Sequence, residues 1–183
     1  MKVSKLAVLF GVATLSLAGL ADAGLHRLSD QAAKAHFHAS GPAGMAIDGS
    51  TSDVTVNDDG TNVKVVVALA NLATGVNLRD EHTRNKYLEV GKFPNATLTV
   101  PRGALKFPAD GATSTGDAQG TMNIHGKDKA VTFHYQATKK GAAIAVSGSV
   151  SVDITDFGIN VPSYLGVTVK KDVSIDVAFA AAD

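Results

Sequence analysis

The sequence predicts an all-β protein whose antiparallel strands form a barrel or a sandwich. Apolar and polar residues alternate along several segments, and in 172–179 one face holds Val173, Ile175, Val177 and Phe179. Alternation with a period of two is typical of strands with one buried and one exposed face. Turn signals such as Gly41-Pro42 separate these segments. The long run 142–154 favours a barrel, in which strands are tilted and extended.

The expected strands follow one another with short turns between them. Segment 61–70 is a clear example, because every second residue from Val63 to Leu69 is apolar. About eight strands are expected, at 35–39, 51–56, 61–70, 97–107, 115–124, 131–137, 144–154 and 172–179. Turns are expected at Asp58-Asp59-Gly60, Ala109-Asp110-Gly111, Gly126-Lys127-Asp128 and Lys140-Gly141.

One segment interrupts the strands with a short helical insertion around residues 77–90. Either Asn77 or Thr74 is suited to cap its first turn. Acidic residues come early in 79–86 and basic residues late, which complements the helix dipole. Gly91 and Pro94 then end the helix.

The sequence of residues 1–23 is typical of a secretory signal peptide. Lys2 and Lys5 precede the apolar run Leu6–Leu20, and Ala21-Asp22-Ala23 supplies small residues for cleavage after Ala23. An uncleaved membrane anchor is the alternative, but the run is shorter than the roughly 20 residues that a membrane span needs. We therefore expect a bacterial periplasmic or secreted protein.

Cleavage leaves residues 24–183, which are 160 of the 183 residues and suit a single domain. Removing Lys2, Lys5 and Asp22 from 17 basic and 17 acidic residues leaves 15 and 16. A near-neutral chain has no general attraction for nucleic acid or anionic membranes. There is no Cys, so stability must come from the core. Small residues are abundant, and composition leaves open whether the interior holds a ligand or is filled.

Three motifs follow one another in order along the chain. They are Thr74-Gly75-x-Asn77-x-Arg79-Asp80-x-His82 with Tyr87-Leu88 and Phe93-Pro94, then Gly120-x-Met122-x-Ile124-His125-Gly126-Lys127 with Val131-x-Phe133, and finally Asp156-Phe157-Gly158-Ile159. They keep their order over about residues 60–180, so the chain after residue 23 resembles one YceI-like domain.

The resemblance implies an extended, lipocalin-like antiparallel β-barrel with a helical insertion. Proteins of this family are exported, are often homodimers and bind long apolar molecules, typically polyisoprenoids such as quinones or prenyl lipids, inside the barrel. Thr83 stands where Leu is usual, Tyr87 where Phe is usual, and Met122 where Leu is usual. The first two changes would make the entrance of the barrel more polar, so the sequence does not determine which ligand binds.

Ten residues are candidates for contact with such a ligand. Arg79 and His82 could orient a polar head group, because a guanidinium offers a planar fork of donors, or they could only brace the barrel rim. Bulky residues at the entrance could line the tunnel or plug it, and others lie deeper. The candidates are Leu78, Arg79, His82, Tyr87, Leu88, Phe93, Met122, Ile124, Phe133 and Phe157. We expect substitution of Phe93 or Ile124 to weaken lipid binding more than substitution of Arg79.

Other functions have weaker signals. His36-x-His38 could form a metal site, and His125 and His134 could meet across a hairpin, but no Cys and no acidic residue lies at ligand spacing beside them. No Gly-x-Ser-x-Gly elbow or phosphate-binding loop indicates an enzyme. We expect no catalysis, no metal and no cofactor apart from a bound isoprenoid lipid or quinone. A His-based metal or catalytic protein and a filled-barrel stress-response module stay as alternatives.

Overall fold

The computed structural model describes residues 24–164 and 167–182. The expected signal peptide, residues 1–23, lies outside the described residues. Within them, no helix is long and apolar enough to cross a membrane.

Strands make up most of the fold, and one helical insertion joins two of them. The strands are β1 (His26–Arg27), β2 (Lys34–Ser40), β3 (Ala46–Thr51), β4 (Val54–Asp58), β5 (Asn62–Ala68), β6 (Asn95–Pro101), β7 (Thr113–Ile124), β8 (Lys127–Lys140), β9 (Ala143–Asp153), β10 (Ser163–Tyr164), β11 (Val167–Thr168) and β12 (Asp172–Ala182). The insertion is helix α1 (Asn77–Glu81), continued by a π-helical turn, His82–Tyr87. Single 3₁₀ turns occupy Pro42–Gly44, Arg102–Ala104 and Ile154–Phe157.

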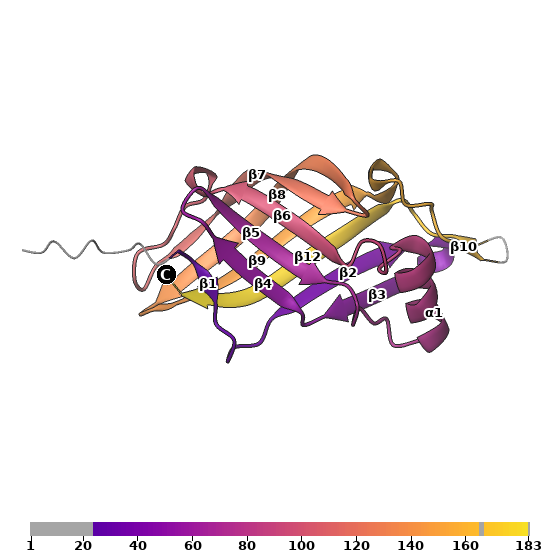
Figure 1. Ribbon diagram of the computed structural model, residues 1–183, viewed down its shortest axis with the longest axis horizontal. Coiled ribbons are helices and arrows are strands. Elements are labelled where there is room, and N and C mark those ends of the chain that lie inside the picture. The colour runs from indigo at the N-terminus through magenta and orange to yellow at the C-terminus, as the bar shows by residue number, and fades with distance from the viewer. Residues whose placement is uncertain (1–23, 165–166, 183) are drawn as a thin grey trace, which may run out of the picture.

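The sheet closes into the expected eight-stranded antiparallel barrel (Figure 1). One edge of β12 pairs first with β2, from Val173 to Ala178, and then with β1 at Ala181 and Ala182. Strand β3 pairs with β2, and β4 pairs with β1. Thus β1 with β2 forms one interrupted barrel strand, and β3 with β4 forms another.

Several expected strands are longer in the structure, most of all 131–137, which is part of β8, so that Lys127 and Asp128 of the expected turn already belong to this strand. Two others are broken or end early. The expected strand 51–56 contains a break, because β3 ends at Thr51 and β4 begins at Val54. The expected strand 97–107 ends at Pro101, where the chain enters the 3₁₀ turn Arg102–Ala104.

Strand β3 was missed because Asp48 and Gly49 interrupt its apolar pattern. A Cβ at Gly49 would overlap Cε1 of Phe37 on the neighbouring β2. The Phe37 ring therefore occupies the space above Gly49, where a larger side chain would not fit without a shift.

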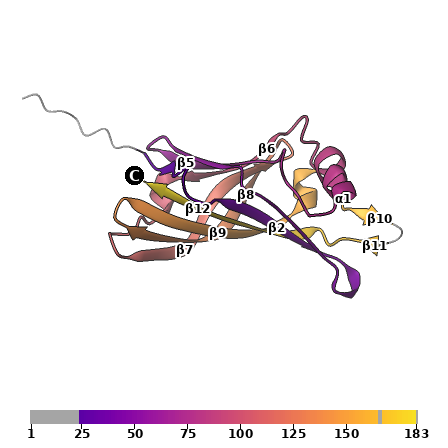
Figure 2. The ribbon, with the colours of Figure 1, turned by 90° about the horizontal axis from the view of Figure 1, so that it is seen from below.

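The two ends of the barrel differ (Figures 1 and 2). At one end lie α1, the β10–β11 hairpin and the β2–β3 hairpin, while β1 and the C-terminal end of β12 lie at the other. The insertion leaves the barrel after Ala68 and returns at Asn95, two residues that are paired partners. The main-chain N–H of Leu69 donates to the carbonyl of Pro94 at 2.9 Å, which joins the two ends of the insertion.

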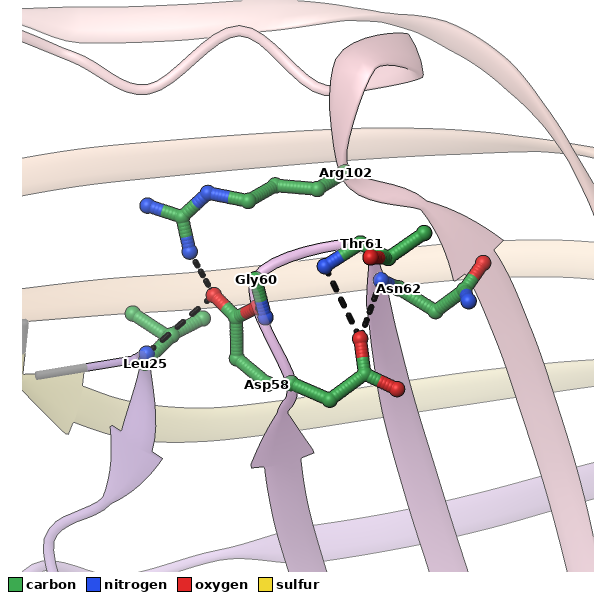
Figure 3. A network of polar contacts seen from close by, with 7 residues as sticks. Leu25, Asp58, Gly60, Thr61, Asn62 and Arg102 are labelled. Carbon is green, nitrogen blue, oxygen red and sulfur yellow. Dashed lines mark hydrogen bonds and ion pairs between the residues drawn. The ribbon is translucent and has the colours of Figure 1, made fainter. Parts of the chain in front are cut away.

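A buried carboxylate fastens the end opposite α1 (Figure 3). The Asp58 side chain is fully buried, forms an ion pair with Arg102 and accepts a hydrogen bond from the main-chain N–H of Leu25 at 3.2 Å. Its other oxygen accepts from the N–H of Gly60 at 2.9 Å. This one side chain thus joins the start of β1, the β4–β5 turn and the turn after β6.

We expect Asp58→Ala to lower the free energy of unfolding by roughly 3 kcal/mol, because it leaves the Arg102 charge without its partner. Urea unfolding of the two proteins measures the loss. Asp59→Ala is the matched control, since the exposed Asp59 side chain accepts hydrogen bonds only within the same turn. Equal stability of Asp58→Ala and wild type would contradict the fastening role.

Candidate functional site: an apolar cavity inside the barrel

The barrel interior contains two adjoining cavities. The outer one has a volume of about 640 Å³ and lies at the α1 end, and the inner one has a volume of about 140 Å³. Both are lined by Val67, Ala96, Ile124 and Ile175. Because they share these four side chains, the two cavities lie next to each other, and together they are called the path from the mouth into the barrel.

The inner cavity is enclosed by the alternating inward residues of the central strands. Side chains such as Val65, Leu98, Met122 and Phe133 line it, from β5, β6, β7 and β8. The buried Tyr135 places its hydroxyl oxygen 2.8 Å from the main-chain N–H of Lys106, which donates to it. The polar end of this ring is therefore satisfied, and its apolar body faces the cavity.

The outer cavity takes its walls from both barrel and insertion. Strands β2 and β3 contribute Phe37 and Ile47, and Met45 precedes β3. The segment that leads into α1 contributes Leu69 and Leu72. Strand β3 is tied to this segment by a pair of main-chain hydrogen bonds, of 2.9 and 3.0 Å, between Ser50 and Ala73.

Thr74 fixes the start of α1 through Arg79 and Asp80. The Asp80 carboxylate accepts from the main-chain N–H of Thr74 at 2.6 Å and from its hydroxyl. Arg79 donates from Nε to the same hydroxyl oxygen at 2.8 Å and from Nη2 to the carbonyl of Thr74 at 2.9 Å. Hydrogen bonds from Thr74 hold the pKa of Asp80 below its usual value. Arg79 and Asp80 therefore brace the mouth through Thr74, the structural role considered for them.

The expected capping of the helix is wrong. Val76 occupies the N-cap position of α1, and no side chain caps it. Thr74 uses its hydroxyl on Asp80 and Arg79 instead, and Asn77 is already inside the helix. The sequence pattern predicted the position of the helix. It did not show that the Thr74 hydroxyl is bonded to Asp80 and Arg79 and is therefore not free to cap the helix.

Eight of the ten candidates line the path. The outer cavity includes Leu78, Arg79, His82, Tyr87, Leu88 and Ile124, and the inner cavity includes Met122, Ile124 and Phe133. The described lining of the outer cavity includes Arg79, His82, Lys86 and Tyr87 at the insertion and borders His36 on β2, and it includes no carboxylate. The mouth thus offers hydrogen-bond donors and positive charge beside an apolar interior.

Phe93 and Phe157 do not line either cavity. The Phe93 ring packs edge-on against His125, with 4.7 Å between ring centroids, and covers Gly126 in the β7–β8 turn. Phe157 is only 1% exposed and packs in the core with Met122, Val152 and Ile159. The expectation that Phe93 lines the entrance is therefore corrected, because the insertion places its ring against the turn.

Sequence reasoning missed the contribution of the β2–β3 hairpin and of the segment around β11. Phe37, Met45, Ile47, Val167 and Val169 all line the outer cavity. The inward position of Phe37 could have been predicted from alternation in β2. The others lie in irregular or interrupted segments, where alternation gives no signal.

The histidines form separate polar contacts. On the outside of β2, His36 Nε2 lies 3.2 Å and His38 Nδ1 lies 2.8 Å from one oxygen of Asp48. The His38 contact is the main reason that the pKa of Asp48 is lowered. His125 contacts Glu89, and His134 contacts Asp117 across the β7–β8 pair, so these two histidines do not meet. The described residues include no group of three or more His, Cys, Asp or Glu side chains arranged to hold a metal.

These features define a lipocalin-like barrel with an apolar internal cavity. The YceI-like domain family matches residues 27–181, and the chain belongs to this family. A relative is the UPF0312 protein of Pseudomonas fluorescens (strain SBW25), 30% identical over 142 residues, which cover 70% of this chain and 68% of the relative.

Two solved structures share the fold. A polyisoprenoid-binding domain from Saccharophagus degradans, implicated in plant cell wall breakdown, superposes with a TM-score of 0.72 and 17% identity, covering 87% of this chain and 98% of that one. BcnA of Burkholderia cenocepacia has a TM-score of 0.65 and 16% identity, covering 82% and 96%.

A carboxylate beside the outer cavity fixes the turn Ile154–Phe157. Asp153 accepts from the main-chain N–H of Thr155 at 2.9 Å and from Lys171 Nζ at 2.6 Å. The Lys171 contact, followed by those from Thr155, lowers the pKa of Asp153 from 3.8 to about 2. Ile154, which begins this turn, lines the outer cavity.

We expect the stability difference between wild type and Asp153→Asn to depend on pH. Because the pKa of Asp153 is depressed in the folded state, its contribution is present above 3.8 and is lost as the pH falls toward 2. Urea unfolding across this range measures the difference, with Asp30→Asn as the control for removing an exposed carboxylate. A difference that is constant with pH would contradict the Asp153 contact.

Proposed function

We propose that this protein is exported and carries or sequesters a long apolar molecule of the isoprenoid type, a quinone or a prenyl lipid. The observation that carries the proposal is the pair of adjoining apolar cavities, outer and inner, which share Ile124 and Ile175 in their walls. The polyisoprenoid-binding domain with the same fold supports this class of ligand. The N-terminal sequence supports export.

Binding would result from desolvation. An isoprenoid chain exposes apolar surface to water, and transfer into the barrel is favourable by roughly 25 cal/mol per Å² of buried surface, before the cost of ordering the chain. The inner cavity would receive the end of the chain, because its walls are almost entirely apolar. A polar head group would stay at the mouth.

At the mouth, His82 and Lys86 are the residues proposed to meet the head group. Both line the outer cavity, and both are exposed on the insertion. Arg79 lines the same cavity, but its Nε and Nη2 donors are already used on Thr74. We therefore assign Arg79 mainly to bracing and expect it to contribute less to the ligand. This role requires binding and release but no catalytic step.

The first test is mass spectrometry of an organic extract of the protein, purified without detergent from its native compartment. A stoichiometric prenyl lipid or quinone is the expected result. A stoichiometric ligand of another class would replace the isoprenoid assignment. A protein that extracts empty and also fails to take up added ubiquinone or a prenyl alcohol would favour the filled-barrel alternative.

We expect Ile124→Asp to reduce the bound ligand by at least about tenfold, because it places a charge where the two cavities meet. Ile124→Phe narrows the same passage without a charge and is expected to shorten the chain length accepted. Thr121→Asp is the matched control, since it adds the same charge to an exposed position of β7. Equal ligand content in all three variants would contradict the assigned path.

A further inference from the structure

The exposed large apolar side chains of this protein are concentrated at the mouth of the barrel. Within the described part of the chain there are four such side chains, and three of them, Val76, Leu78 and Val167, line the outer cavity. Their exposed fractions are 49%, 60% and 41%. Placing such surface in water is unfavourable, and contiguous exposed apolar patches mark sites of interaction.

Three projecting segments form this rim. Figure 2 places α1, the β10–β11 hairpin and the β2–β3 hairpin at the same end of the barrel. The tip of the last hairpin, Gly41–Met45, has no charged residue, and its Pro42 and Ala43 are exposed. Met45 at its base lines the outer cavity. The uncharged tip lies at the same end of the barrel as the exposed side chains of Val76, Leu78 and Val167, and together these are called the rim.

Positive charge lies just inside the rim. Arg79 and Lys86 line the outer cavity, and the described lining includes no carboxylate. Of the acidic residues on α1, Asp80 is buried against Thr74, and Glu81 is exposed but outside the lining. An apolar surface bordered by Lys and Arg is typical of proteins that rest on a bilayer, where apolar side chains enter the acyl boundary and cations meet lipid phosphates.

We propose that the rim docks on the surface of a phospholipid bilayer, with the mouth of the cavity facing the membrane. Continuity with the cavity supports this partner, because the exposed side chains of the rim also line the path inward. A long apolar molecule could then pass between bilayer and barrel without crossing water, which would cost roughly 25 cal/mol per Å² of apolar surface exposed.

A second copy of the chain fits the rim less well. A symmetric dimer through this surface would bring the same patch of each copy together, and Lys86 and Arg79 of both would approach without acidic partners in the lining. A bilayer with anionic lipids supplies the opposite charge. The near-neutral net charge of the whole chain does not prevent binding to anionic lipids, because the attraction acts only between the lipid head groups and the basic residues at the rim.

Vesicle sedimentation tests the proposal, using protein from its native compartment and vesicles of phosphatidylcholine with or without phosphatidylglycerol. We expect wild type to sediment with the vesicles, more strongly when phosphatidylglycerol is present and less strongly at high salt. Val76→Asp with Leu78→Asp should weaken binding by roughly tenfold or more, because two inserted apolar side chains are lost. Lys86→Glu should remove most of the preference for phosphatidylglycerol.

Phe107→Asp is the matched control. Phe107 is the fourth exposed large apolar side chain and borders the inner cavity at the end of the barrel opposite the rim, where its ring packs against Arg102, the partner of Asp58. It therefore controls for docking at the rim and not for ligand content. This variant should bind vesicles like wild type. The proposal is overturned if wild type does not sediment with either vesicle, or if Phe107→Asp weakens binding as much as the rim variant.

Two further outcomes separate this proposal from others. Self-association that Val76→Asp with Leu78→Asp abolishes, without vesicle binding, would assign the rim to a second copy and overturn docking. Vesicle binding by a protein that contains no isoprenoid would support docking while contradicting the proposed ligand. The two proposals can therefore fail independently.

Discussion

The whole structure depends on the hydrogen-bond pairing of β12, the strand that closes the barrel. One edge of β12 pairs with β9 from Asp172 to Ala182, and its other edge is divided between β2 and β1. Closure removes the free sheet edges that would otherwise invite association with other chains. Closure also encloses the inward side chains of every strand. The pairing of β12 therefore creates the internal cavity as well as the closed sheet.

The cavity exists because closure fixes the barrel width while the inward side chains are mostly small or β-branched. Val65, Val67 and Ala96 do not reach across the interior, and the larger Phe133 and Met122 fill it only partly. Well-packed cores rarely leave voids larger than a water molecule. An apolar space of this size therefore suits a protein that stores another molecule better than one that maximises its own packing.

Polar groups at the mouth are mostly used to hold the insertion in place. Asp80 and Arg79 bind Thr74, and Arg84 donates to the carbonyl of Leu72 at 3.0 Å. With these groups committed, the surface left around the opening is largely apolar, with Lys86 and His82 at its border. The same insertion thus fixes the shape of the mouth and determines which side chains a ligand or a membrane would meet.

The sequence by itself determined an antiparallel all-β fold with one helical insertion, because alternation and turn residues act over a few neighbours. The choice of a lipocalin-like barrel and the candidates Met122, Ile124 and Phe133 came with the resemblance to the family, and the structure places all three against the inner cavity. Only the tertiary structure decided that Phe93 covers the β7–β8 turn, that Asp48 lies beside His36, and that Val76 and Val167 share one rim. These depend on contacts between segments distant in sequence, whose geometry is set by barrel closure and leaves no local pattern.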